Sequence, residues 1–107
     1  MTSHRPQRSS RTVGIVALDY EIAQEQATAL GRLGRALEAA LAALTDYDRA
    51  NPKRDAMRKE LVQDASDALW RFIVQREACG LRDPRPVIRE YRVPAEVYAR
   101  MGAFGRH

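Results

Sequence analysis

The sequence predicts an all-α fold, in which two long helices form an antiparallel hairpin and one or two short C-terminal helices pack on it. Apolar residues recur at steps of three and four from about Leu18 to Tyr47, and again from about Pro52 to Cys79. This is the spacing of amphipathic helices. The stretch between them is short and polar, and a short connection makes neighbouring helices antiparallel. A chain of 107 residues has room for one small domain.

The first long helix carries a ridge of leucines. Its members follow the steps of a heptad seam: Ala23, Gln26, Leu30, Leu33, Leu37, Ala40, Leu44 and Tyr47. One shoulder of the ridge is lined by Ala29, Ala36 and Ala43, which are spaced by sevens. Gly31 and Gly34 lie in the same helix, where a glycine costs about 1 kcal/mol relative to alanine. They either mark the close approach of a neighbour or are tolerated in an alanine-rich helix.

The second long helix has a start signal and a stop signal. Asn51 is a favourable N-cap and Pro52 a favourable first helical residue, while Gly80 suits the left-handed conformation that ends a helix. Its main apolar face is predicted to comprise Met57, Leu61, Ala65, Ala68, Leu69, Phe72, Ile73 and Cys79. Trp70 and Val74 point away from this face, so the helix needs a second cover.

The C-terminal tail is the predicted cover for Trp70. Asp83 and Pro84 form another cap-plus-proline start. The segment 84–91 is either a short helix or, because its apolar residues also alternate, a short extended segment. Pro94 is predicted to open a last helix that carries Val97, Tyr98 and Met101 and ends at Gly102.

The domain organisation predicted is a disordered basic segment over residues 1–12, followed by a single helical domain over residues 13–107. The first segment contains three arginines, no acid and no large apolar side chain beyond Met1, so it cannot offset its ordering entropy by burial. The apolar run Val13–Leu18 is too short for a secretory core region, and no run approaches the length of a membrane span. We therefore expect a cytoplasmic protein that does not bind membranes.

A homodimer is predicted because the leucine ridge is too broad for the hairpin and tail to cover. A second hairpin would complete a dimeric four-helix-bundle core. The residues expected to pack there or at the dimer interface are Leu30, Leu33, Leu37, Leu44, Trp70 and Val74.

No catalytic, cofactor-binding or metal-binding residue is predicted. The single cysteine, Cys79, lies at a helix C-terminus without a mid-chain histidine to activate it, and both histidines are terminal. Glu21 and Glu25 are interpreted as an exposed surface pair. Asp64 is placed opposite Gly34 by a turn near residue 49, where it either accepts a hydrogen bond or reaches water, and we favour water.

Three runs carry a family resemblance: Leu18-Asp-Tyr-Glu-Ile-Ala-Gln-Glu25, Trp70-Arg-Phe-Ile-Val-Gln-Arg-Glu77 and Val93-Pro-Ala-Glu-Val-Tyr-Ala-Arg-Met-Gly102. Together they resemble a family of small bacterial all-helical proteins of unknown function, over roughly residues 15–103. The resemblance implies a small intracellular helical domain and brings no activity, cofactor or site residue.

Three function hypotheses follow from these patterns. The leading one is a non-catalytic, homo-oligomeric interaction or assembly module, with a further protein partner left open. The alternative is a small nucleic-acid-associated protein that uses its arginine-rich ends, although no helix-turn-helix or basic-zipper signature is present. The third is a small enzyme or ligand carrier whose site forms around Trp70 and the tyrosines.

Overall fold

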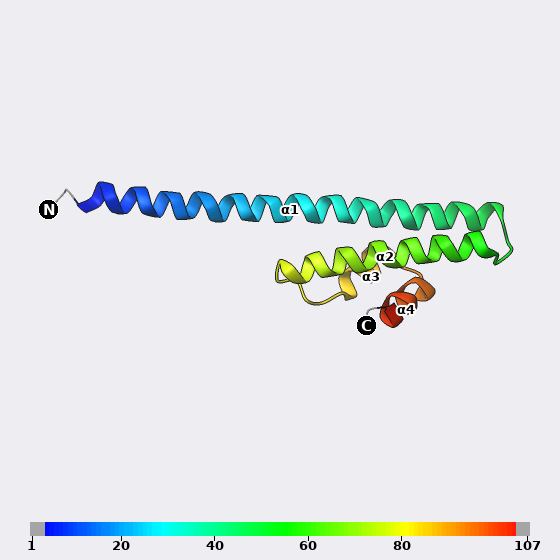
Figure 1. Cartoon of the computed structure of the whole chain (residues 1–107). Helices are drawn as coiled ribbons and strands as arrows, with labels where there is room; N and C mark the ends of the chain where they lie inside the picture. The colour runs from blue at the N-terminus through cyan, green and yellow to red at the C-terminus, as the bar shows by residue number, and fades with distance from the viewer. Residues whose placement is uncertain (1–3, 105–107) are drawn as a thin grey trace.

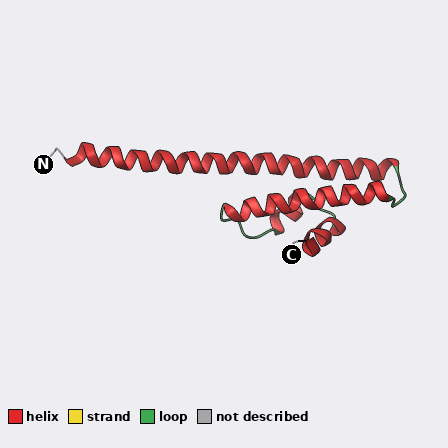
Figure 2. Ribbon diagram, viewed as in Figure 1, coloured by secondary structure: helices red, strands yellow, loops and turns green. Residues whose placement is uncertain are grey.

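The computed structural model describes the backbone of residues 4–104 and the side chains of residues 13–101. Within this range every element is a helix (Figures 1 and 2): α1 His4–Ala50, α2 Ala56–Ala78, α3 Arg85–Glu90 and α4 Ala95–Phe104. Helices α1 and α2 pack side by side as an antiparallel hairpin, which confirms the predicted all-α hairpin. No helix of the described residues is long and apolar enough to cross a membrane.

Helix α1 is much longer than its partner. Its 47 residues span about 70 Å at 1.5 Å per residue, whereas the 23 residues of α2 span about 34 Å. The molecule is therefore elongated, with principal extents of 77 × 26 × 21 Å.

The start of α1 differs from the predicted start near Leu18, because the helix begins at His4. The helix thus extends into residues 1–12, the segment for which we predicted disorder. Residues 1–3 lie outside the described residues, as do the side chains of residues 4–12. The disorder of that segment stays a prediction.

The N-cap of α2 is Asp55, so the predicted start at Asn51 and Pro52 is wrong. The Asp55 carboxylate accepts a hydrogen bond from the backbone N–H of Arg58 at 3.0 Å, as an N-cap does. Asn51 instead closes α1, because its backbone N–H and its side-chain amide both donate to the carbonyl of Tyr47. At the other end, Gly80 has a φ of +90°, which confirms the predicted stop.

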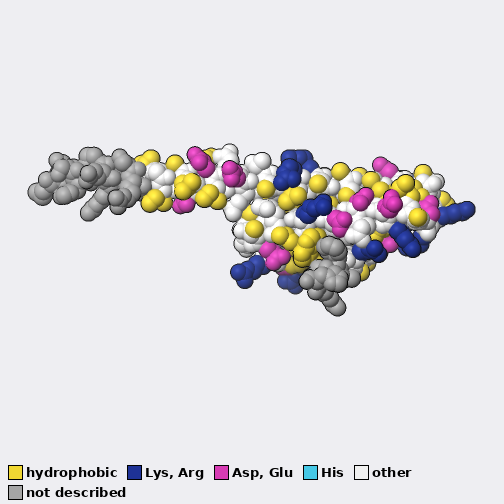
Figure 3. All heavy atoms as spheres, in the orientation of Figure 1, with side chains coloured by type: hydrophobic (Ala, Val, Ile, Leu, Met, Phe, Trp, Pro, Cys, Tyr) yellow, Lys and Arg dark blue, Asp and Glu magenta, His cyan; other side chains and the backbone are white. Residues whose placement is uncertain are grey.

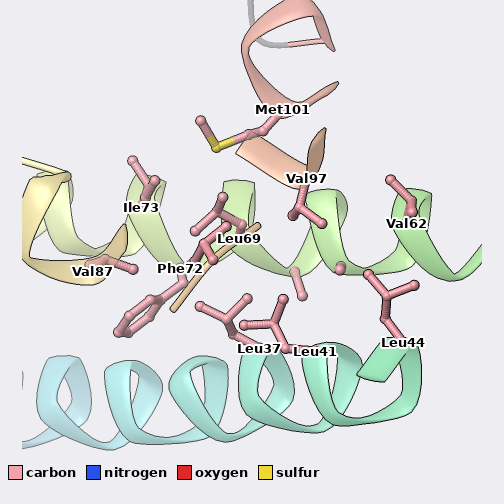
Figure 4. Close-up of a cluster of buried hydrophobic side chains, with 13 residues drawn as sticks. Leu37, Leu41, Leu44, Val62, Leu69, Phe72, Ile73, Val87, Val97 and Met101 are labelled. Carbon is pink, nitrogen blue, oxygen red and sulfur yellow. The ribbon is translucent and has the colours of Figure 1, made fainter. Parts of the chain in front are cut away.

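The hydrophobic core lies between the C-terminal half of α1 and one face of α2, and the C-terminal helices close its other side (Figure 4). Its buried members are Leu37, Leu41, Leu44, Val62, Ala65, Ala68, Leu69, Phe72, Ile73, Val87, Val93, Val97 and Met101. Met57, which we placed on the main face of the second helix, is 52% exposed. It lies in the first turn of α2, two residues after the cap Asp55.

The C-terminal segment forms two short helices, so the helical alternative for residues 84–91 is the correct one. Helix α4 packs on α2 and buries Val97 and Met101, whereas Tyr98 faces out. The buried hydroxyl of Ser66 in α2 lies 2.9 Å from the carbonyl of Val62 and 3.0 Å from that of Val97. A donor placed there can hydrogen-bond across the α2–α4 contact, so the polar group is satisfied inside the core.

Gly34 lies where another helix approaches α1 closely. A Cβ at this position would lie 2.8 Å from the hydroxyl oxygen of Tyr91 and 3.5 Å from the ring of Phe72. At Gly31 a Cβ would meet only the side chain of Arg35, so close approach explains Gly34 alone. The predicted pairing of Gly34 with Asp64 is wrong, because α1 runs on to Ala50 and the turn comes later. Asp64 is exposed to water, as we favoured.

Candidate interaction surface

The N-terminal part of α1 projects beyond the hairpin (Figure 1). We call residues 13–29 the projecting half of α1. Large apolar side chains here are between 48% and 68% exposed: Val13, Ile15, Val16, Leu18, Tyr20 and Ile22. Figure 3 shows hydrophobic side chains open on this part of the helix, past the end of the hairpin. A concentration of exposed apolar side chains is typical of interaction sites.

The predicted interface residues fall into three groups. Leu37 and Leu44 are buried within the protomer against α2, so they pack the core and are unavailable to a partner. Leu30, Leu33 and Trp70 are half-buried at the edge of that core. Val74 is exposed. The ridge that we assigned in part to a dimer is therefore used largely inside one chain.

The projecting half was missed by the sequence reasoning, although a signal for it is present. Ile15 and Ile22 are spaced by seven, and the same spacing continues through Ala29, Ala36 and Ala43. Residues seven apart lie almost two helical turns apart and share a face. We name these five residues the heptad stripe. Ile15, Ile22, Ala36 and Ala43 are exposed and Ala29 is half-buried.

The flank of the heptad stripe is charged. Residues 13–29 contain three acids and no lysine or arginine, in a chain of formal net charge +4. A shallow hollow of about 660 Å³ follows this flank along α1, lined by Tyr20, Glu21, Gln24, Glu25, Thr28, Ala29 and Arg32. All of these residues come from one helix, so the hollow is open to a partner. Glu21 and Glu25 are exposed, as predicted.

The most connected polar group is Arg58, which joins three helices. Its buried guanidinium donates from Nε to Asp48 Oδ1 of α1 at 2.8 Å and from Nη1 to Glu96 Oε2 of α4 at 2.9 Å. Hydrogen bonds from Arg58 hold the pKa of the Glu96 carboxyl below its usual value. Because charge-assisted bonds of this kind fix orientation as well as position, Arg58 locks α1, α2 and α4 together. No sequence pattern had singled it out.

A second polar link fixes the turn of the hairpin. The hydroxyl of Tyr47 donates to Asp55 Oδ2 at 2.5 Å. This bond raises the pKa of Tyr47 and lowers the pKa of Asp55. The end of α1 is thereby tied to the cap of α2.

A pocket of about 250 Å³ lies beside Arg58, between the start of α2 and α4. It is lined by Arg54, Asp55, Arg58, Lys59, Val62, Glu96 and Arg100. Two of the arginines that line the pocket are already paired. The Arg54 guanidinium lies 3.4 Å from the Glu96 carboxylate, and Arg100 donates a hydrogen bond to the side chain of Gln63. Arg54, Arg58 and Arg100 therefore link the elements that surround the pocket.

Groups suited to nucleophilic or metal chemistry are sparse in the described part of the chain. Cys79 is half-buried at the C-cap of α2, with the Gln75 amide 3.8 Å from its sulfur. Among the described residues, no three His, Cys, Asp or Glu side chains gather as a metal site would require. The surface that stands out is therefore the projecting half of α1.

Comparison with known proteins finds a family match over most of the chain. The model of a family of unknown function, DUF6665, matches residues 5–107. No curated protein and no solved structure matches the chain.

Proposed function

The chain belongs to this family of unknown function, and we propose from its structure that it is a non-catalytic interaction module that assembles as a homodimer. The observation that carries the proposal is the projecting half of α1, where six large apolar side chains are exposed and no other described element packs. The hairpin supplies the rigid part of the module, and the projecting half supplies the contact.

The physical reason is the cost of a long unsupported helix. Most of the stability of a protein helix comes from packing its apolar face. The projecting half has apolar residues to bury, and within the described residues no other element lies beside it, because α2 ends at Ala78 and α4 packs on α2. A second chain supplies the missing packing surface and favours the helix by burying its apolar side chains.

A second copy is the occupant that the charges favour. The projecting half is acidic, whereas the chain as a whole is basic. Arg32 and Arg35 of α1 are exposed in the hairpin. Two copies that lay the projecting half of one against this part of the other therefore bring acids near arginines. Attraction of this kind speeds association and selects orientation.

The test is the molar mass in solution, measured by light scattering behind size exclusion at two salt concentrations. We expect a mass near twice 12.1 kDa at both, because the contact is mainly apolar. The double variant Ile15→Lys/Ile22→Lys should be a monomer, since two charges would have to be buried. Both residues lie outside the core, so the hairpin should stay folded.

The matched control is Ala27→Lys. Ala27 lies five residues after Ile22 and so about 140° away round the helix, and it is exposed and does not line the hollow. This variant should remain a dimer. A wild-type mass of 12.1 kDa at high micromolar concentration would contradict the proposal.

A further inference from the structure

We infer that the second copy packs on α1 in antiparallel orientation, with Ala29 at the two-fold axis, so that each projecting half lies on the partner's hairpin. This inference rests on the proposed function and specifies its geometry. Three observations support it: the heptad stripe, the lengths of the two long helices, and the charges beside the stripe.

The lengths of α1 and α2 fit an antiparallel pair. Helix α2 is about half as long as α1, and Leu30 is the first leucine of α1 that packs at the edge of the core. A copy reversed about Ala29 brings its own hairpin alongside the part of α1 that α2 leaves uncovered. Each α1 is then supported along both halves, once by its own chain and once by the other.

The positions of the heptad stripe are symmetric about Ala29, but the side chains are not, because isoleucines precede Ala29 and alanines follow it. Reversal about Ala29 places Ile15 opposite Ala43 of the second copy, and Ile22 opposite Ala36. Large side chains then meet small ones at every layer except the central one, where Ala29 meets Ala29 of the second copy. This pattern allows two helices to approach closely and interdigitate. Leu18 falls opposite Ala40 under the same reversal, so a third large residue also meets an alanine.

The stripe is accessible along the hairpin. Ala36 and Ala43 are exposed, although they lie next to Leu37 and Leu44, which are buried against α2. The face that approaches Tyr91, at Gly34, is also a different one. The second copy can therefore reach the alanines without displacing α2 or the C-terminal segment, and the arrangement is that of a four-helix bundle.

The charges beside the stripe distinguish antiparallel from parallel pairing. In an antiparallel pair, one flank of a helix lies against the same flank of the second copy, with the order of the residues reversed. Glu25 then lies next to Arg32 of the second copy, and Glu21 lies within a turn of Arg35. In a parallel pair Glu25 and Arg32 of the second copy stay seven residues, about 10 Å, apart along the axis, so the two charges do not meet. Glu21, Glu25 and Arg32 all line the open hollow on α1.

The test is disulfide trapping with single cysteines in a Cys79→Ser background, oxidised with diamide. Ala29→Cys should form a covalent dimer quickly, because only a residue at the axis meets its own copy. Ile15→Cys and Ala43→Cys should each stay uncrosslinked alone, and an equimolar mixture of the two should form a covalent heterodimer. All four positions are outside the buried core, so the variants should fold.

The outcomes separate this geometry from the proposed function. Self-crosslinking of Ile15→Cys and of Ala43→Cys would show a parallel pair, which overturns the antiparallel register and leaves the dimer standing. A dimeric mass before oxidation without a crosslink at Ala29→Cys would also overturn the register. A monomeric mass of the Cys79→Ser protein itself would overturn both.

Discussion

The two halves of α1 present the same chemistry in opposite situations. Residues 30–50 bury Leu37, Leu41 and Leu44 against α2, while residues 13–29 expose Ile15, Leu18 and Ile22 to water. Both halves have large aliphatic side chains at helical spacing: leucines in residues 30–50, and isoleucine, valine and leucine in residues 13–29. The periodicity of apolar residues thus indicates which side of a helix needs a packing partner. The length of the next helix decides whether that partner comes from the same chain.

The largest effect that sharpens this comparison is expected at Leu37, which is fully buried. Leu37→Ala should lower the free energy of unfolding by about 2–5 kcal/mol, because it removes buried methyl groups and leaves a cavity. The loss should be similar at low and high protein concentration. Urea denaturation followed by circular dichroism at two concentrations measures it.

Ile22→Ala is the matched change in the projecting half. Its effect on stability should grow with protein concentration, because the side chain is buried only when a second copy binds. If Ile22→Ala destabilised the most dilute protein as much as Leu37→Ala does, the projecting half would have a partner within its own chain, and the contrast between the halves would be lost.

A smaller effect on stability is expected at Gly34, where residues 30–50 of α1 approach Tyr91 and Phe72. Gly34→Ala should destabilise the protein by about 1 kcal/mol, since overpacking outweighs the gain in helix propensity. The Cβ would press on the Tyr91 hydroxyl, and Tyr91 is held edge-on against Phe72 with ring centroids 5.5 Å apart.

The double variant Gly34→Ala/Tyr91→Phe tests this explanation. Without the hydroxyl, the nearest remaining contact is the Phe72 ring at an ordinary distance of 3.5 Å. Alanine should then be neutral or stabilising in thermal unfolding compared with Tyr91→Phe alone. Equal losses from Gly34→Ala in both backgrounds would show that the Tyr91 hydroxyl is not what requires the glycine.

Much of the fold was predictable from local sequence. The leucine spacing identified the C-terminal half of α1, Gly80 marked the end of α2, and Pro94 marked the start of α4, because each signal acts within one or two helical turns. The start of α2 was misplaced because Asn51 and Asp55 are both good caps. The bonds that decide between them, from Tyr47 to Asp55 and from Asn51 back into α1, form only once the hairpin has closed.

The candidate site was less predictable, for two physical reasons. Deciding whether Leu37 and Leu44 pack in the core of one chain or at a dimer interface required knowing how far α2 extends along α1, which depends on where the turn lies. The role of Arg58 depends on Asp48 and Glu96, which lie 10 and 38 residues away and share no pattern with it. The heptad stripe was readable in the sequence, but its importance follows from the exposure of Ile15 and Ile22 in the structure.

The central claim is that residues 13–29 are packed only when a second copy binds, and amide hydrogen exchange tests it most directly. Exchange should be measured residue by residue on the full chain at a low and a high protein concentration. We predict protection of residues 30–50 at both concentrations, and protection of residues 13–29 that rises strongly with concentration. Exchange of residues 13–29 that is equally fast at both concentrations would contradict the claim.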